Sequence, residues 1–177
     1  MTSNLKSVDA TAGARYAPTE RKDRGQIPRG YAAIGLYNPK CPANVGGALR
    51  AAGCYGASMV AMAGHRFSKA PTDVQKQWRL TPVICTEDLQ LVVPYDCVPV
   101  AVDLIHGAVS LTDYQHPERA FYVFGPEDGT LGERVTSWCR DVVYVPMAAG
   151  CMNLAASVNV VLYDRMAKFA SGKRRAA

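Results

Sequence analysis

The sequence has no run of apolar residues that approaches the roughly 20 needed to cross a membrane. Its N-terminus also lacks the basic and then apolar segment of a secretory signal. These two absences argue against a membrane-spanning or secreted protein. They predict a cytoplasmic location and no membrane partner.

Cysteine patterns that bind metals are absent as well. None of the six cysteines forms a C-x-x-C pair, and no histidine lies beside them at zinc-ligand spacing. We therefore expect reduced, buried thiols and no metal site. The six are Cys41, Cys54, Cys85, Cys97, Cys139 and Cys151.

Two nucleotide-binding fingerprints are missing too. The chain contains neither a G-x-G-x-x-G segment nor a Walker lysine, which argues against a Rossmann-type NAD enzyme and against a P-loop protein. It also shows no internal repeat and no long low-complexity segment. Its 177 residues fit a single domain that can bury a sizeable core.

The positive charge is concentrated at the two ends of the chain. Residues 1–30 hold six basic and three acidic residues, and residues 165–177 hold five basic residues and no acid, so that 31–164 carries nine basic against twelve acidic residues. Basic ends on a near-neutral body suit a polyanion such as RNA, although a solubilising tail has the same composition. We expect a flexible basic arm over 1–28, a folded domain over 29–170 and a basic tail over 171–177.

Short apolar runs alternate with segments of helical pattern from Tyr31 onward. The runs are continuous, as in strands that are buried on both faces of a parallel sheet. The sequence therefore predicts an α/β fold, with a mostly parallel sheet flanked by helices. Strands are expected at 31–37, 57–62, 81–85, 98–103, 120–124 and 142–146, and helices at about 44–55, 72–79, 131–139 and 153–169.

Ligands of such sheets bind beyond the carboxyl ends of the strands, and the first unusual loop there is 38–50 (NPKCPANVGGALR). Asn44 is predicted to cap a helix, and Gly46 and Gly47 leave its first turn bare, so that backbone N–H groups can approach a phosphate or sugar. Arg50 lies about 120° around the helix from Asn44 and can reach over its N-terminus. The loop predicts an anion site, with a plain glycine-rich turn beside a surface arginine as the alternative.

Two later loops are also unusual. Residues 124–132 (FGPEDGTLG) end a strand in a glycine-rich turn, where Glu127 can accept hydrogen bonds from hydroxyls or from a helix N-terminus. Residues 145–157 (VPMAAGCMNLAAS) combine small side chains, which leave room for a flat ligand such as adenine, with the start of a helix. Asn153 can cap that helix or contact the ligand.

In this order and near these spacings, the three loops resemble the signature motifs of the SpoU/TrmH RNA methyltransferases of the SPOUT superfamily. The family patterns are N-x-G-x-x-x-R, G-x-E-x-x-G-L and P-M-x-x-x-x-S-L-N. The first pattern is complete here, while Thr130 replaces a glycine of the second. Cys151 and Met152 replace the Ser-Leu of the third, after three intervening residues instead of four. The resemblance covers residues 31–165.

The resemblance implies a deep C-terminal trefoil knot that binds S-adenosylmethionine, a homodimer formed through the last helix and the first motif, and methyl transfer to a ribose 2′-hydroxyl of RNA. It assigns catalysis to Arg50, which we expect to hold a phosphate and stabilise a developing alkoxide, with Asn44 orienting Arg50 or the ribose. The expected cofactor contacts are Leu104, Gly125, Pro126, Glu127, Val145, Met147, Cys151, Asn153 and Leu154.

The short body has no obvious appended RNA-binding domain and in this resembles the compact transfer-RNA enzymes of the family, so tRNA is the expected partner. One alternative is a knotted RNA-binding protein that has lost catalysis, against which the intact Asn44 and Arg50 argue. The other is the NAD enzyme that the missing glycine fingerprint disfavours.

Overall fold

The structure is a computed structural model, and it describes residues 30–64 and 77–172. The predicted basic arm over 1–28 and all but the first two residues of the predicted tail over 171–177 lie outside the described residues. Most of the helix expected over 72–79 does as well, because the description resumes at Gln77. No helix in the described part of the chain is long and apolar enough to cross a membrane.

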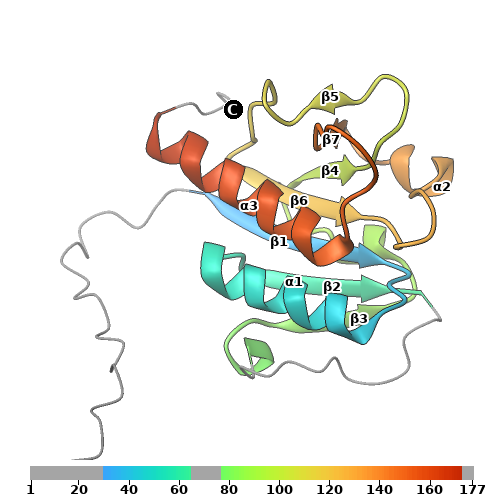
Figure 1. Cartoon of the computed structure of the whole chain (residues 1–177). Coiled ribbons are helices and arrows are strands. Elements are labelled where there is room, and N and C mark those ends of the chain that lie inside the picture. Colours follow the sequence, from blue (N-terminus) through green and yellow to red (C-terminus); the bar gives the residue numbers. More distant parts are fainter. Residues whose placement is uncertain (1–29, 65–76, 173–177) are drawn as a thin grey trace, which may run out of the picture.

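A seven-stranded sheet forms the centre of the molecule, and all of its strand pairs are parallel (Figure 1). The strand order is β3-β2-β1-β6-β4-β7-β5. The strands are β1 (Tyr31–Tyr37), β2 (Met59–Ala63), β3 (Val83–Thr86), β4 (Val98–Val102), β5 (Val109–Ser110), β6 (Arg119–Phe124) and β7 (Asp141–Tyr144). Because all strands run the same way, their carboxyl ends lie along one edge of the sheet. The predicted parallel α/β fold is confirmed.

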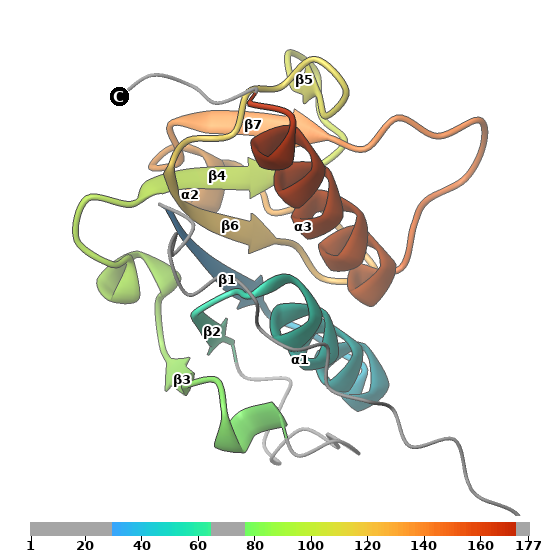
Figure 2. The same ribbon diagram turned by 90° about the vertical axis from the view of Figure 1, so that its left-hand side faces the viewer.

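Two long helices cover one face of the sheet, and shorter elements cover the other (Figure 2). The long helices are α1 (Pro42–Tyr55) and α3 (Leu154–Ala170), which pack against each other. The opposite face is covered by α2 (Glu133–Thr136) and the 3₁₀ turn η2 (Leu89–Val92), while a second 3₁₀ turn, η1 (Gln77–Arg79), lies beside α1.

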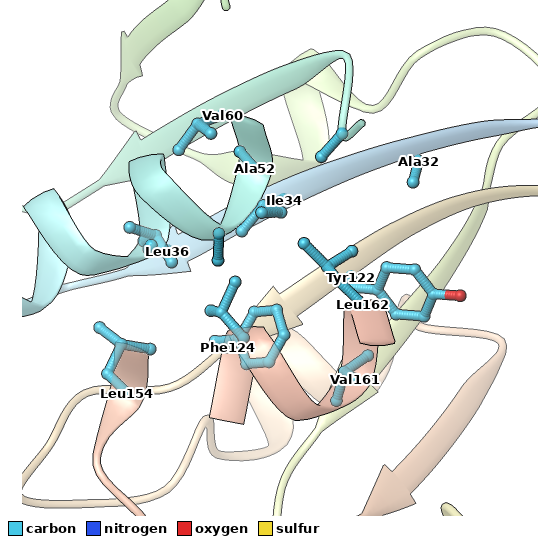
Figure 3. Packing of buried hydrophobic residues seen from close by; sticks show 14 of the residues in the cluster. Ala32, Ile34, Leu36, Ala52, Val60, Tyr122, Phe124, Leu154, Val161 and Leu162 are labelled. Atoms are coloured by element: carbon cyan, nitrogen blue, oxygen red, sulfur yellow. The ribbon is translucent and has the colours of Figure 1, made fainter. Parts of the chain in front are cut away.

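Each face of the sheet has its own hydrophobic core. The larger core joins α1 and α3 to β1 and β6, and Figure 3 shows Ile34, Phe124 and Leu162 within it. The smaller core places Leu131 and Val135 against the opposite face. Burial on both faces is the reason that the strands read as continuous apolar runs.

The contact between α1 and α3 depends on Gly47. A Cβ atom at this position would lie 2.6 Å from the Cβ of Ala155, closer than side chains tolerate. The small residues of the two helices therefore allow the backbones to approach. We predicted that Gly47 leaves the helix bare for a ligand, but in the structure this bare face meets α3.

The last turns of α3 are fixed to the sheet by buried polar groups. Arg165 is only 6% exposed and donates to the backbone carbonyls of Pro117 at 2.6 Å and Glu118 at 2.7 Å. Lys168 forms an ion pair with Asp164 at 2.7 Å and donates to the carbonyl of Tyr114. Both cations, which the charge count includes in the basic end over 165–177, are thus bonded inside the protein.

Some predicted elements differ from the observed ones. The helix expected over 131–139 is reduced to one turn, because Gly132, at φ +71°, starts it late and the chain turns into β7 soon after. Of the helix expected over 72–79, the described end is the 3₁₀ turn at Gln77–Arg79. The short strand β5 was not predicted. The strand order is consistent with the trefoil knot that the resemblance implies, and the threading itself stays a prediction.

Candidate functional site

A cavity of about 440 Å³ lies at the carboxyl edge of the sheet, beyond β4, β6 and β7 and against the start of α3. Parallel sheets bind their ligands at this edge, because the loops that follow neighbouring strands converge there. Its lining consists of Val102, Asp103, Leu104, Phe124, Gly125, Pro126, Glu127, Asp128, Gly129, Thr130, Tyr144, Val145, Met147, Cys151, Met152, Leu154 and Ser157.

All the predicted cofactor contacts except Asn153 line this cavity. Asn153 is exposed and caps α3, with its Oδ1 accepting from the backbone N–H of Ala156 at 2.7 Å. The structure thus assigns Asn153 the capping role that was one of its two alternatives. The second and third loops meet as the sequence led us to expect.

Glu127 connects the cavity to the first loop. Its carboxylate accepts hydrogen bonds from the backbone N–H groups of Lys40 at 2.8 Å and Cys41 at 3.1 Å, and from Nδ2 of Asn44 at 2.8 Å. Partial burial alone would raise the pKa of Glu127, but the bonds from Asn44 and from these N–H groups hold that pKa below its ordinary value. Glu127 is therefore ionised at neutral pH and is a weak proton acceptor. It binds the N-terminal end of α1, which is one of the two roles that the sequence predicted for it.

The prediction that Asn44 caps α1 was wrong. Cys41 occupies the N-cap position and Pro42 follows as the first helical residue, so that the helix begins two residues earlier than expected. Proline suits that position because its φ is already helical and its missing N–H is not needed there. Asn44 lies in the first turn of the helix, where its side chain is free to bind Glu127.

Arg50 lies on the exposed side of α1 and is not among the residues that line the cavity. It follows Asn44 by six residues, or about 9 Å along the helix axis. Glu127 therefore couples the loop after β6 to the helix that carries Arg50. The structure brings Asn44 to the cavity rim and leaves Arg50 at the surface.

Asp103 was not predicted, although it is one of the lining residues. Its two carboxylate oxygens accept from the backbone N–H groups of Leu104 at 2.8 Å and Leu131 at 2.7 Å, so that the side chain connects the loop after β4 to the loop after β6. The available signal was an acid directly after a buried strand. A single acid forms no motif, which is why sequence reasoning passed over it.

The lining is acidic. It contains the carboxylates of Asp103, Glu127 and Asp128, and no lysine, arginine or histidine is among the lining residues named above. Lys40 approaches from the first loop, with its Nζ 3.5 Å from Asp128. The cavity therefore suits a ligand that carries positive charge, and a pyrophosphate would meet repulsion there.

The departures from the motifs are accommodated without strain. Neither Gly129 nor Thr130 has a positive φ, so the loop needs no glycine at position 130 and no compensation from its neighbour. Cys151 is exposed at the cavity wall. The loop after β6 keeps its shape instead through the bond from Leu131 to Asp103.

Comparison with protein families gives a match to the SpoU rRNA Methylase family over residues 31–163, which is most of the chain. This chain belongs to the SpoU family. The match ends just short of the Arg165 and Lys168 anchor and includes all three motif loops. The predicted SpoU/TrmH membership within the SPOUT superfamily is confirmed.

Solved SpoU-family structures share this fold. The SpoU methyltransferase AviRb from Streptomyces viridochromogenes is 20% identical with a TM-score of 0.71, and the alignment covers 81% of this chain and 61% of AviRb. This SpoU-family chain thus spans about three fifths of the length of AviRb, which has also been solved in complex with the cofactor AdoMet.

Two further structures concern tRNA. The TrmH/SpoU tRNA modifying enzyme of A. aeolicus is 14% identical with a TM-score of 0.70, and 80% of this chain and 77% of that one are covered. A protein whose structure gives insights into the 2-OH methylation of C/U34 on tRNA is 21% identical with a TM-score of 0.68, and 81% of this chain and 99% of that one are covered. At these identities the likeness establishes the fold. The comparison with curated protein sequences gave no match.

The described residues of this SpoU-family chain contain no group of three or more His, Cys, Asp or Glu side chains placed to hold a metal ion. Both ring nitrogens of His116 already lie within hydrogen-bond distance of other side chains. Its ring is fully buried, with Nδ1 2.6 Å from the hydroxyl of Tyr122 and Nε2 2.8 Å from Asp164, and burial lowers its pKa to about 4. His116 contacts Asp164 in the last turns of α3, whereas the cavity lies at the start of that helix.

Proposed function

We propose that this protein is an S-adenosylmethionine-dependent RNA methyltransferase that methylates a ribose 2′-hydroxyl, with tRNA as its substrate. The observation that carries the proposal is the acidic cavity at the carboxyl edge, which is formed by the motif loops of a methyltransferase family. The alignment covers 99% of the protein whose structure concerns the 2-OH methylation of C/U34 on tRNA, and this likeness favours tRNA over rRNA as the substrate.

The lining residues fit the cofactor. A volume of about 440 Å³ lies within the range of roughly 300–1,000 Å³ that is usual for small-molecule sites. Leu104, Val145 and Leu154 give it apolar walls, and backbone groups of the loop after β6 supply polar contacts. S-adenosylmethionine carries a sulfonium and an ammonium group, which the lining carboxylates stabilise, whereas NAD would bring its phosphates to the same acids.

The protein's own residues supply alignment and charge. When bound, the cofactor provides a methyl group that is activated by a positively charged sulfur. Arg50 stays protonated, because a guanidinium does not lose its proton in proteins, and so it holds the phosphate beside the target ribose and stabilises the developing alkoxide. The hydroxyl proton passes to water or to another group. Glu127 holds Asn44 and the start of α1 in place, which fixes the helix that carries Arg50.

We further propose a homodimer in which α3 lies at the interface. Tyr163 and Met166 of α3 are 56% and 46% exposed, and the ring of Tyr163 rests edge-on against that of Tyr55 of α1. Exposed apolar side chains on neighbouring helices are typical of surfaces that are covered by another chain. Light scattering of the full chain distinguishes the dimer from a monomer.

The decisive experiment measures transfer of a tritiated methyl group from S-adenosylmethionine to unfractionated tRNA, with ribosomal RNA in a parallel arm. We expect Arg50→Ala to lower the rate by about 100-fold or more. Its affinity for S-adenosylmethionine should stay within a few-fold of normal, because Arg50 lies outside the cavity. The matched control is Arg140→Ala, an exposed arginine beside the opposite edge of the sheet.

Each part of the proposal has its own refutation. Tritium that is recovered in mononucleotides after alkaline hydrolysis of the RNA would place the methyl group on a base instead of the ribose. Cofactor binding without transfer to either RNA would favour the inactive RNA-binding alternative. Loss of cofactor binding in a folded Arg50→Ala protein would overturn the placement of Arg50.

A further inference from the structure

A second cavity lies at the same edge of the sheet, beyond β1, β2 and β3 and beside α2. Its volume is about 260 Å³, and it shares no lining residue with the larger cavity. It is lined by Tyr37, Asn38, Gly64, Glu87, Asp88, Arg134 and Val135. Sequence reasoning assigned no role to its charged residues.

Tight backbone contacts shape this second cavity. The N–H of Asn38 donates to the carbonyl of Ala63 at 2.6 Å, and Asn38 itself has a φ of 49°. Gly64 has a φ of +116°, and a Cβ atom there would lie 2.8 Å from the Cα of Asn38. Only glycine permits this approach. The part of the cavity wall formed by Asn38 and Gly64 is thus set by the backbone.

One short loop separates the two cavities. Asn38 lines the second cavity, and two residues later the N–H groups of Lys40 and Cys41 bind Glu127, which lines the first. The two cavities are therefore neighbours along the carboxyl edge of the sheet. Arg134 also follows closely after the loop that lines the first cavity.

The lining offers charges that the fold itself does not use. Glu87 and Arg134 are exposed and line the same cavity, yet within the described residues neither makes a hydrogen bond or an ion pair. Asp88 caps η2 through its Oδ1. Tyr37 is half-buried, packs against the smaller core and is one of the lining residues.

We propose that the second cavity binds an unstacked nucleotide of the RNA other than the one that is methylated, with guanine as the preferred base. This inference rests on the proposed function, because it takes RNA as the substrate. Proteins read single-stranded RNA by stacking splayed bases on aromatic rings and by hydrogen-bonding their edges. The volume lies below the range of roughly 300–1,000 Å³ for larger ligands, so it suits one base. A carboxylate of Glu87 accepts from the two adjacent N–H donors of guanine, Arg134 binds the phosphate, and Tyr37 offers the ring.

The test is the binding of unfractionated tRNA to the full chain by filter binding without cofactor, so that its outcome does not depend on catalysis. Arg134→Ala should weaken binding by at least about fivefold, as expected when a charged hydrogen bond is removed. The slope of log affinity against log salt should fall by about 0.7–0.9, the value of one phosphate contact. Arg140→Ala, the matched control at the opposite edge, should change neither quantity by as much.

Base preference is tested by competition. GMP should displace tRNA at lower concentration than AMP, CMP or UMP, and Glu87→Gln should remove this preference, whereas Glu133→Gln should keep it. Unchanged thermal unfolding and S-adenosylmethionine affinity confirm that the variants are folded. Equal effects of Arg134→Ala and Arg140→Ala, or equal competition by all four nucleotides, would overturn the assignment. If the protein were no methyltransferase, the wild type would instead fail to transfer methyl groups or to bind the cofactor.

Discussion

Replacing Glu127 by glutamine tests whether this carboxylate holds the first loop. The wild-type side chain accepts three hydrogen bonds, all at 3.1 Å or less. A hydrogen bond to a charged group contributes about 1.5–3 kcal/mol when buried. Because Glu127 is only partly buried and the glutamine amide oxygen can still accept one or two of these bonds, we expect a loss of about 1–2 kcal/mol of unfolding free energy at pH 7.

The pH dependence of that loss identifies its cause. The pKa of Glu127 is lower in the folded protein than its ordinary value of 4.5, so the folded state favours the ionised form. The stabilisation is fully present above the unfolded pKa and is lost as the pH falls through the folded pKa. Urea unfolding of the wild type and Glu127→Gln should therefore show a difference that is constant from about pH 7 to about pH 5 and shrinks at lower pH.

The control is Glu133→Gln, the same change at an exposed glutamate that follows the same loop. It should alter stability by less than about 0.5 kcal/mol. A Glu127→Gln difference that stays the same as the pH falls below 4.5, or that equals the control at neutral pH, would refute the role of the carboxylate.

Three further predictions follow from other contacts. Gly47→Ala should destabilise the fold by about 1–3 kcal/mol in urea unfolding, because its Cβ would overlap that of Ala155, and adding Ala155→Gly should restore most of the stability. Asn153→Ala should cost about 1 kcal/mol by removing a helix cap and leave the Kd for S-adenosylmethionine within about twofold, whereas a larger change in Kd would show a direct contact with the cofactor. Removing residues 1–28 and 172–177 should weaken tRNA binding and flatten its salt dependence, by about 0.7–0.9 in slope for each phosphate that the ends neutralise, and an unchanged slope would show that the ends do not touch RNA.

The strands were predictable because the sheet is buried on both faces. The apolar run at 31–37 coincides with β1, since burial of both faces leaves no polar position to blur its limits. The two residues of β5 carry no such run, which is why that strand was missed. Helix limits were harder, because Pro42 and Gly132 act through backbone geometry that the apolar pattern does not reflect.

The residues of the candidate site also include some that the sequence predicted and some that it did not. The predicted cofactor contacts include eight of the seventeen residues that line the larger cavity, because the loops after parallel strands must converge. Pairings between distant residues were out of reach, as with Glu127 and Asn44, which lie 83 positions apart. The count of charges did not separate Arg165 from exposed cations, because a sequence does not show whether a cation faces solvent or a row of backbone carbonyls.

The position of α3 also determines when the protein becomes competent during synthesis. One wall of the larger cavity comes from the loop after β7 and the first turn of α3, and the far end of that helix is held by Arg165. A nascent chain that ends before Arg165 has all seven strands and all three motif loops, yet it lacks the anchor that keeps this wall in place. Domains fold as units while the chain emerges. Cofactor capture therefore waits until this helix has been made, and ligand binding selects chains whose synthesis has passed it.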